Sequence, residues 1–223
     1  MNIFDIDKLN NMIPSGFIVF ISGVTGTGKS TLSNELLRTF DTFRIIEETD
    51  LIRETLRGYG EYLQEEFGDK IKPLLESKLI TGHKKILTFD DTKQQCLYMR
   101  KSIEKIVERQ QRRKIPSIIN GVHIVPEILD GILGNRNVIY LNLYVDNQNE
   151  IYNRLFKRDP SSFTLDYISM FHETNIAIYL STLKLSRKIE HLFNNINVTN
   201  LNAKEVLGIA IEQISKVVKM QKL

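Results

Sequence analysis

The sequence predicts an α/β fold, in which a parallel five-stranded sheet lies between two layers of helices. Two observations predict it. Apolar segments short enough for buried strands alternate along the chain with longer segments whose apolar residues recur at helical spacing. The first strand, residues 17–21, leads into the glycine-rich turn GVTGTGKST, and a helical pattern follows. Because strands separated by helices pair in parallel, this alternation indicates a single α/β domain over residues 1–223.

The glycine-rich turn fits the phosphate-binding pattern G-x-x-x-x-G-K-[ST] of a P-loop. Its backbone N–H groups and the positive end of the following helix attract phosphate oxygens. We expect Lys29 to reach the β- and γ-phosphates and the Ser30 hydroxyl to hold Mg²⁺. The sequence therefore predicts a P-loop NTPase fold, similar to that of nucleoside kinases, that binds ATP and Mg²⁺. The residues expected to contact the nucleotide are Gly23, Thr25, Gly26, Thr27, Gly28, Lys29, Ser30 and Thr31.

The composition is that of a globular protein, with 42% hydrophobic and 26% charged residues. No apolar run approaches the roughly 18 residues of a membrane span. The opening MNIFDIDKLNNM carries acids where a signal peptide carries basic residues, so we expect a cytoplasmic location and no membrane partner. The net charge of +3 suits an anionic substrate and does not indicate a nucleic acid. The sequence leaves open whether the protein forms a homodimer.

The single cysteine, Cys96, excludes an internal disulfide and a cysteine metal cluster. Its apolar neighbours Leu97 and Met99 favour a buried position on a helix over a nucleophile.

After the P-loop helix, residues 43–46 are expected to form a second strand that ends in two glutamates. The segment TDLIRETLRG follows. It predicts a short helix that begins near Thr49 or Asp50 and stops at Gly58.

Residues 59–92 mix helical fragments with glycine and proline, so we expect an acceptor-binding insertion there. A longer amphipathic helix is predicted over residues 92–113. The second half of the chain continues the alternation. The further strands are expected at residues 116–119, 137–145 and 191–198, and the further helices at residues 150–158, 168–187 and 203–219.

The residues that follow the strands favour a small-molecule kinase over other P-loop proteins. The sequence lacks the pattern N-K-x-D with which GTPases read guanine, and the third strand ends in Asn120 and Gly121 rather than in an acid. Instead, an acid with arginines follows the second strand and a basic helix follows the fourth. Phosphoryl transfer needs groups that align the acceptor and neutralise the charge spreading over the transferred group.

The acceptor side is expected just after the second strand. We expect Asp50 to accept the proton of the acceptor hydroxyl or to orient magnesium, although it can also serve as a helix N-cap. Arg53 and Arg57 lie one helical turn apart, so they can clamp an anionic acceptor together. A solvent-facing Arg57 is the alternative.

Two further regions complete the predicted site. Arg154 and Arg158 are expected on a helical lid over residues 150–165, which closes over the phosphates and supplies positive charge in the transition state. An exposed cationic helix is the alternative. His123 follows a predicted central strand, at the sheet edge where ligands of α/β folds bind. It either contacts the acceptor or serves as a structural hydrogen-bonding group.

Three segments in this order, GVTGTGKST, TDLIRETLR and GVHIVP, resemble the 2-phosphoglycerate kinase family of P-loop kinases. The resemblance implies transfer of the γ-phosphate of ATP to a hydroxyl of a small phosphorylated or carboxylate substrate. Lys29 and Ser30 match the nucleotide site of the family, Asp50 and Arg53 match its TD-x-I-R-E element, and His123 matches the histidine of GVH. Where that family has a glutamate before GVH, this chain has Asn120.

Two alternatives stay open at this point. In a nucleotide or nucleic-acid 5′ kinase, the basic run at the end of the helix over residues 92–113 would follow a phosphate backbone. That run contains Arg109, Arg112, Arg113 and Lys114. In a non-catalytic ATP-binding regulatory module, Asn120 would mark the loss of catalysis.

Overall fold

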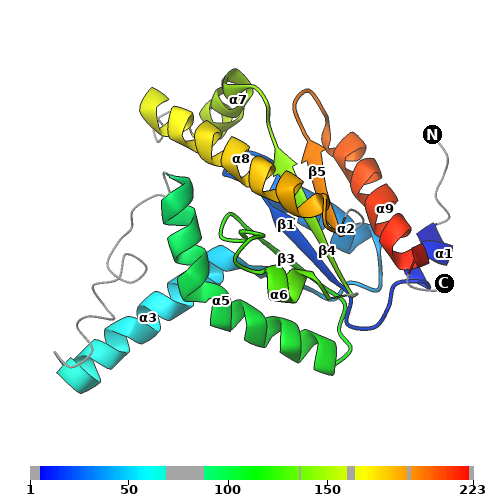
Figure 1. Cartoon of the computed structure of the whole chain (residues 1–223), viewed down its shortest axis with the longest axis horizontal. Coiled ribbons are helices and arrows are strands. Elements are labelled where there is room, and N and C mark those ends of the chain that lie inside the picture. The colour runs from blue at the N-terminus through cyan, green and yellow to red at the C-terminus, as the bar shows by residue number, and fades with distance from the viewer. Residues whose placement is uncertain (1–5, 69–87, 136, 160–163, 190–191, 221–223) are drawn as a thin grey trace.

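A five-stranded parallel sheet forms the centre of the structure, a computed structural model that describes residues 6–68, 88–135, 137–159, 164–189 and 192–220 (Figure 1). The strand order is β2-β3-β1-β4-β5, so the strand that leads into the P-loop is central. The strands are β1 (Ile18–Ser22), β2 (Ile45–Glu48), β3 (Ser117–Gly121), β4 (Val138–Tyr144) and β5 (Phe193–Asn197). The predicted α/β fold with a parallel five-stranded sheet is confirmed.

The register of the sheet brings the carboxyl ends of neighbouring strands to one edge. Ser22, the last residue of β1, pairs with Gly121 of β3 and with Asn142 of β4. β1 and β3 are buried along their whole length, as expected of strands covered on both faces. Side chains and loops that follow these strands therefore meet at a single site.

Helices cover both faces of the sheet, which gives the predicted three layers. α2 packs against α9 on one face, and α5 packs against α8 on the other. α3 begins at the edge strand β2 and runs outward from the sheet (Figure 1). The helices are α1 (Ile6–Asn10), α2 (Lys29–Thr39), α3 (Thr49–Phe67), α5 (Phe89–Arg112), α6 (Asp130–Leu133), α7 (Gln148–Arg158), α8 (Leu165–Ser186) and α9 (Ala203–Met220).

Several boundaries differ from those that the sequence predicts. The prediction that the helix after β2 stops at Gly58 is wrong, since α3 continues to Phe67. A glycine inside a helix costs only about 1 kcal/mol relative to alanine, and the following residues are good helix formers. β2 begins at Ile45 rather than at residue 43 because Phe43 turns into the core, where its ring meets that of Phe40 edge to face.

α5 begins at Phe89, three residues before the predicted start, because the Thr88 side chain accepts a hydrogen bond from the backbone N–H of Asp91 and caps the helix. Cys96 lies on the buried face of α5, as predicted, and burial raises the pKa of its thiol to about 11. The predicted acceptor-binding insertion over residues 59–92 stays untested, since residues 69–87 lie outside the described part of the chain. None of the described helices is long and apolar enough to cross a membrane.

Candidate active site

The P-loop joins β1 to α2 and holds its own shape. The Thr27 hydroxyl donates a hydrogen bond of 2.9 Å to the backbone carbonyl of Val24. Gly26 has a φ of 90°, in the region that favours glycine, and a Cβ there would lie 3.2 Å from Leu155 of α7. The loop is therefore packed directly against the helix that carries the predicted lid arginines.

Lys29 turns back over the P-loop. Its amine donates a hydrogen bond of 2.9 Å to the carbonyl of Val24. The pKa of this amine is lowered to about 8, mainly by burial and in part by the positive charge of Arg158, while the negative charges of Asp50 and Glu48 oppose the shift. A lysine with this pKa is still mostly charged at neutral pH, so it suits a group that binds phosphate.

A cavity of about 510 Å³ lies above the P-loop, at the carboxyl ends of β2 and β3. It brings together the four residues predicted to act in catalysis, which come from three separate segments: Lys29, Asp50, Arg154 and Arg158. Its lining consists of Thr25, Gly26, Gly28, Lys29, Ser30, Thr31, Glu48, Asp50, Asn120, Gly121, Arg154 and Arg158. The predicted contacts Gly23 and Thr27 belong to the same loop, but they do not line this cavity.

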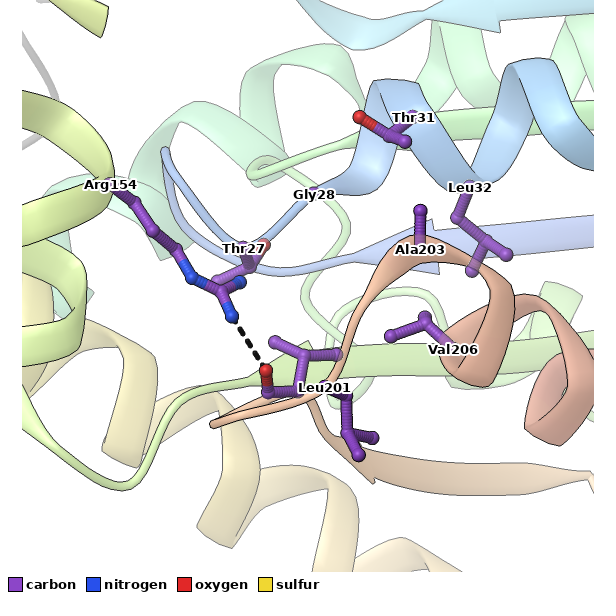
Figure 2. A pocket seen from close by; sticks show the side chains of 9 residues that line it. Thr27, Gly28, Thr31, Leu32, Arg154, Leu201, Ala203 and Val206 are labelled. Carbon is purple, nitrogen blue, oxygen red and sulfur yellow. Dashed lines mark hydrogen bonds between the residues drawn. The ribbon is translucent and has the colours of Figure 1, made fainter. Parts of the chain in front are cut away.

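A second, smaller cavity of about 160 Å³ lies beside the start of α2 (Figure 2). On one side Thr27, Gly28, Thr31 and Leu32 line it. The opposite side is formed by the segment between β5 and α9 together with the first turn of α9, with Val198, Leu201, Ala203 and Val206. Most of these side chains are apolar, so this cavity suits a small, weakly polar group.

Arg154 lines both cavities. Its guanidinium donates a hydrogen bond of 2.7 Å to the carbonyl of Val198 (Figure 2). It donates another of 2.7 Å to the carboxylate of Glu150. The sequence predicted that Arg154 and Arg158 act together over the phosphates. In the structure, both arginines line the larger cavity, and the Arg154 guanidinium also reaches toward the segment between β5 and α9. Residues 160–163 of the predicted lid lie outside the described residues.

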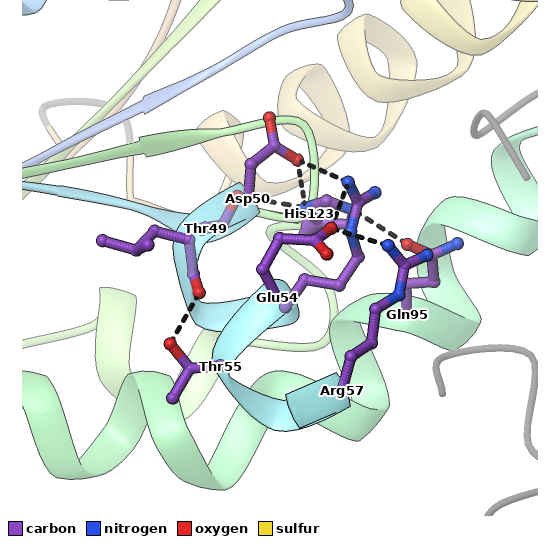
Figure 3. A network of polar contacts seen from close by, with 9 residues as sticks. Thr49, Asp50, Glu54, Thr55, Arg57, Gln95 and His123 are labelled. Atoms are coloured by element: carbon purple, nitrogen blue, oxygen red, sulfur yellow. Dashed lines mark hydrogen bonds and ion pairs between the residues drawn. The ribbon is translucent and has the colours of Figure 1, made fainter. Parts of the chain in front are cut away.

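The predicted acceptor residues form a polar network at the start of α3 (Figure 3). The Asp50 side chain is 63% exposed and faces the larger cavity. One of its oxygens lies 3.5 Å from the Arg53 guanidinium and 3.8 Å from Nδ1 of His123. Asp50 thus lies where an acceptor in the cavity and the side chains behind it can both reach its carboxylate.

Arg53 is buried for the most part and only loosely satisfied. Its side chain is 18% exposed, and its contacts with Asp50, Glu54 and Nε2 of His123 are 3.5, 3.3 and 3.5 Å long. The Arg53 Nε is buried with no hydrogen-bond partner among the described residues. Because an unsatisfied buried donor is costly, Arg53 can gain from binding an anion.

Arg57 does not face the solvent, so the solvent-facing alternative is wrong. It is buried and donates a hydrogen bond of 2.6 Å to the Glu54 carboxylate, which also lies beside Arg53. The hydrogen bond from Arg57 lowers the pKa of Glu54. The two arginines therefore share one carboxylate in this structure.

His123 is fully buried, 0% exposed, so it lies behind the acceptor residues and does not line the cavity. Nδ1 lies 3.0 Å from the Thr49 hydroxyl and Nε2 lies 2.8 Å from Oε1 of Gln95. Because that amide oxygen only accepts, Nε2 is assigned the hydrogen and Nδ1 accepts from Thr49. Burial, with the charges of Arg53, Lys29 and Arg57, holds the pKa of His123 well below its ordinary value. The imidazole is therefore neutral.

The sequence did not indicate several residues of this site. Glu48 lines the larger cavity, yet its position as the last residue of β2 was the only signal. Gln95 is a polar residue on the buried face of α5, and a polar side chain among apolar ones could have indicated a buried partner. Asn120, by contrast, was singled out in the sequence; it is 3% exposed and its amide donates a hydrogen bond of 2.9 Å to the Ser33 hydroxyl.

No group of three or more histidine, cysteine or carboxylate side chains suited to a metal occurs within the described ranges. Mg²⁺ in nucleotide sites does not need one, since it is bound by one or two carboxylates, water and phosphate oxygens. The Ser30 hydroxyl and two carboxylates, Glu48 and Asp50, line the larger cavity. This set of oxygen atoms fits a magnesium ion that arrives with a nucleotide.

The basic run at the end of α5 lies away from this site. It directly precedes β3, so it lies at the amino-terminal edge of the parallel sheet, whereas the P-loop follows the carboxyl end of β1. Its members are Arg109, Arg112, Arg113 and Lys114.

Part of the chain matches a known family. Residues 19–106, less than half of the chain, match the viral superfamily 1 RNA helicase core domain. A match of this extent does not assign the chain to that family. No curated protein matches the sequence.

Three kinases are among the solved structures of similar shape. Shikimate kinase from Acinetobacter baumannii, in complex with shikimate, is 13% identical, with a TM-score of 0.49, over 96% of this chain and 99% of the kinase. Deoxyadenosine kinase from M. mycoides with bound dATP is 13% identical, with a TM-score of 0.48, over 89% and 98%. Shikimate kinase from Bacteroides thetaiotaomicron is 15% identical, with a TM-score of 0.47, over 91% and 98%. Similarities this low assign no activity to the chain.

Proposed function

We propose that the protein is an ATP-dependent phosphotransferase that phosphorylates a hydroxyl of a small anionic metabolite. The observation that carries this proposal is one cavity that contains both a P-loop lysine and an exposed acid, Asp50, with the loosely satisfied Arg53 behind it. A protein that only binds ATP needs the P-loop lysine, but it does not need an acid and an arginine beside it. Phosphoryl transfer needs both the nucleotide-binding lysine and the groups that bind the acceptor.

The two cavities bind different parts of the nucleotide. The triphosphate lies along the P-loop in the larger cavity, where the N–H groups at the start of α2, Lys29 and Arg158 supply positive charge. The base lies in the smaller, apolar cavity between the start of α2 and the segment that precedes α9. Mg²⁺, held in part by Ser30, neutralises negative charge on the phosphates when it is bound.

The acceptor lies on the side of α3. Asp50 receives the proton of the acceptor hydroxyl as that oxygen attacks the γ-phosphorus, while the bond from this phosphorus to the β–γ bridging oxygen breaks and ADP leaves. Arg53 binds an anionic group of the acceptor, because its guanidinium is positively charged, partly buried and held by long contacts alone. His123 acts as a positioning residue, since Thr49 and Gln95 fix its imidazole 3.8 Å from the Asp50 carboxylate.

2-Phosphoglycerate is the first candidate acceptor, on the resemblance of TDLIRETLR and GVHIVP to the family named for it. Such a molecule offers an anionic group for Arg53 as well as a hydroxyl for Asp50. The basic run at the end of α5 gives no support to a nucleic-acid kinase, because it lies at the opposite edge of the sheet from the P-loop.

The proposal is tested with purified protein, labelled ATP, Mg²⁺ and a panel of phosphorylated acids, nucleotides and RNA ends. We expect label to pass to a small phosphorylated acid, and Lys29→Ala to abolish the transfer. Asp50→Asn is expected to lower kcat more than it lowers ATP affinity. Asp41→Asn is the matched control, since Asp41 borders a different cavity, near the start of β3.

Two results would contradict the proposal. Transfer that persists in Lys29→Ala would refute the assigned nucleotide site. Tight ATP binding without transfer to any acceptor of the panel would favour the regulatory module instead, and equal losses of kcat and ATP affinity in Asp50→Asn would argue against an acceptor-side role for Asp50.

A further inference from the structure

The ends of β2 and β3 bring an acid and an amide side by side. Glu48, the last residue of β2, is the register partner of Asn120 in β3. Both residues line the larger cavity together with Ser30. The end of β3 therefore offers a neutral side chain, while the neighbouring position on β2 offers a carboxylate.

Asn120 is tied to the P-loop helix. Its amide nitrogen donates to the Ser33 hydroxyl at 2.9 Å, and that hydroxyl donates to the Lys29 carbonyl at 2.9 Å. The side chain carries no charge, so it cannot replace the electrostatic contribution of a carboxylate to a divalent cation. Its visible role is to connect β3 to α2.

The two carboxylates of the cavity have different surroundings. Asp50 lies 3.5 Å from the Arg53 guanidinium and 3.8 Å from His123, so it belongs to the acceptor network. The Glu48 carboxylate makes no hydrogen bond or ion pair with any residue that the structure describes. Its negative charge nevertheless acts on Lys29. Glu48 is thus the uncommitted carboxylate on the nucleotide side of the cavity.

We propose that Glu48 is the carboxylate that holds Mg²⁺ in the nucleotide complex, directly or through a water molecule, and that it supplies from β2 the charge that Asn120 does not supply from β3. This inference rests on the proposed function, since the ion arrives with ATP. Mg²⁺ prefers carboxylate oxygens and keeps several of its waters, so a single exposed glutamate beside the Ser30 hydroxyl suits it. Asp50 is then left to serve the acceptor.

Glu47 provides a matched control. It precedes Glu48 in β2, and neighbouring side chains of a strand point to opposite faces. The Glu47 carboxylate accepts a hydrogen bond of 3.1 Å from Gln110 of α5, and it does not line the larger cavity. Glu47→Gln therefore removes the same charge from the same strand without reaching the nucleotide.

The test measures binding rather than turnover. A fluorescent ATP analogue is titrated onto wild type, Glu48→Gln and Glu47→Gln at a series of Mg²⁺ concentrations. We expect Glu48→Gln to raise the Mg²⁺ concentration at half-maximal binding by about 10- to 100-fold, the usual effect of losing a group that supports a metal. Without Mg²⁺, Glu48→Gln should bind the analogue more tightly than wild type, because a negative charge beside the phosphates is gone. Glu47→Gln should match wild type in both conditions.

A second comparison tests whether a carboxylate on β3 can replace the carboxylate of Glu48 on β2. Adding Asn120→Asp to Glu48→Gln returns a carboxylate to the same edge of the cavity, so we expect it to lower the Mg²⁺ midpoint again. A double variant that keeps the Mg²⁺ midpoint of Glu48→Gln would refute the claim that Glu48 supplies the charge that Asn120 does not. Equal midpoints for wild type and Glu48→Gln, or a shift seen with Asp50→Asn instead, would overturn the assignment of Glu48. If wild type binds no nucleotide at any Mg²⁺ concentration, the proposed function itself fails, and this inference fails with it.

Discussion

The buried imidazole of His123 makes a specific prediction about stability at acidic pH. In the native state, burial and the charges of Arg53, Lys29 and Arg57 hold the pKa of His123 well below the ordinary value of 6.5. The unfolded chain has no such constraint, so it takes up a proton near pH 6.5 while the native state does not. Stability is therefore fully present above pH 6.5 and is lost as the pH falls below it.

The size of the effect follows from this difference in protonation. Each pH unit below the pKa of the unfolded state costs the native state about 1.4 kcal/mol until the native histidine also takes up a proton. Between pH 7 and pH 5 the loss reaches about 2 kcal/mol when the native imidazole stays neutral over that whole range. For a protein of this size, that corresponds to a fall in Tm of about 4–8 °C.

His123→Gln removes the titrating group and keeps a side chain that can hydrogen-bond to Thr49 and Gln95. We expect Tm to fall less steeply with decreasing pH in this variant than in wild type, whatever the difference in Tm at pH 8. The measurement is thermal unfolding by circular dichroism at steps from pH 8 to pH 5. The remaining ionisable groups are common to both proteins, so parallel curves would refute the claim that His123 is held neutral in the native state.

Four further predictions concern single residues. Because the pKa of Lys29 is lowered to about 8, the affinity for an ATP analogue should fall as the pH rises through that value, and constant affinity from pH 7 to pH 9 would contradict it. Gly121→Ala places a Cβ against the Thr49 hydroxyl, so a loss of about 1–3 kcal/mol is expected in urea unfolding. Gly58→Ala, which meets open space in α3, should stabilise by about 1 kcal/mol in the same assay. Cys96, with its thiol pKa raised to about 11, should resist iodoacetamide in the native protein and react only after unfolding, as read by mass spectrometry.

The parts of the fold that depend on local sequence could be predicted. The P-loop needs a run of neighbouring residues in one turn, and buried strands such as β1 need only a short apolar segment, so both can be read from the sequence. The end of α3 could not, because its glycines weaken a helix without deciding where it stops. The end of α3 depends on packing with other parts of the chain, which the local sequence does not reveal.

The candidate site was predicted as a set of segments rather than as a geometry. The sequence indicated that Asp50, Arg53 and His123 belong together, but it did not indicate that His123 lies behind the other two. Sequence also could not place Glu48 beside Asn120, since that pair depends on the register of two strands far apart in the chain. Likewise, the turn of Arg154 toward Val198 depends on a loop 44 residues away.

The position of Arg154 has a consequence for the way in which pieces of a nucleotide bind. One guanidinium borders both the apolar cavity and the cavity above the P-loop, and its hydrogen bond to Val198 ties α7 to the segment before α9. A ligand fragment that fills one cavity and fixes this side chain therefore changes the neighbouring cavity for the other fragment. The binding free energies of a nucleoside and of inorganic triphosphate are then not additive, and the intact nucleotide acts as a single cooperative ligand.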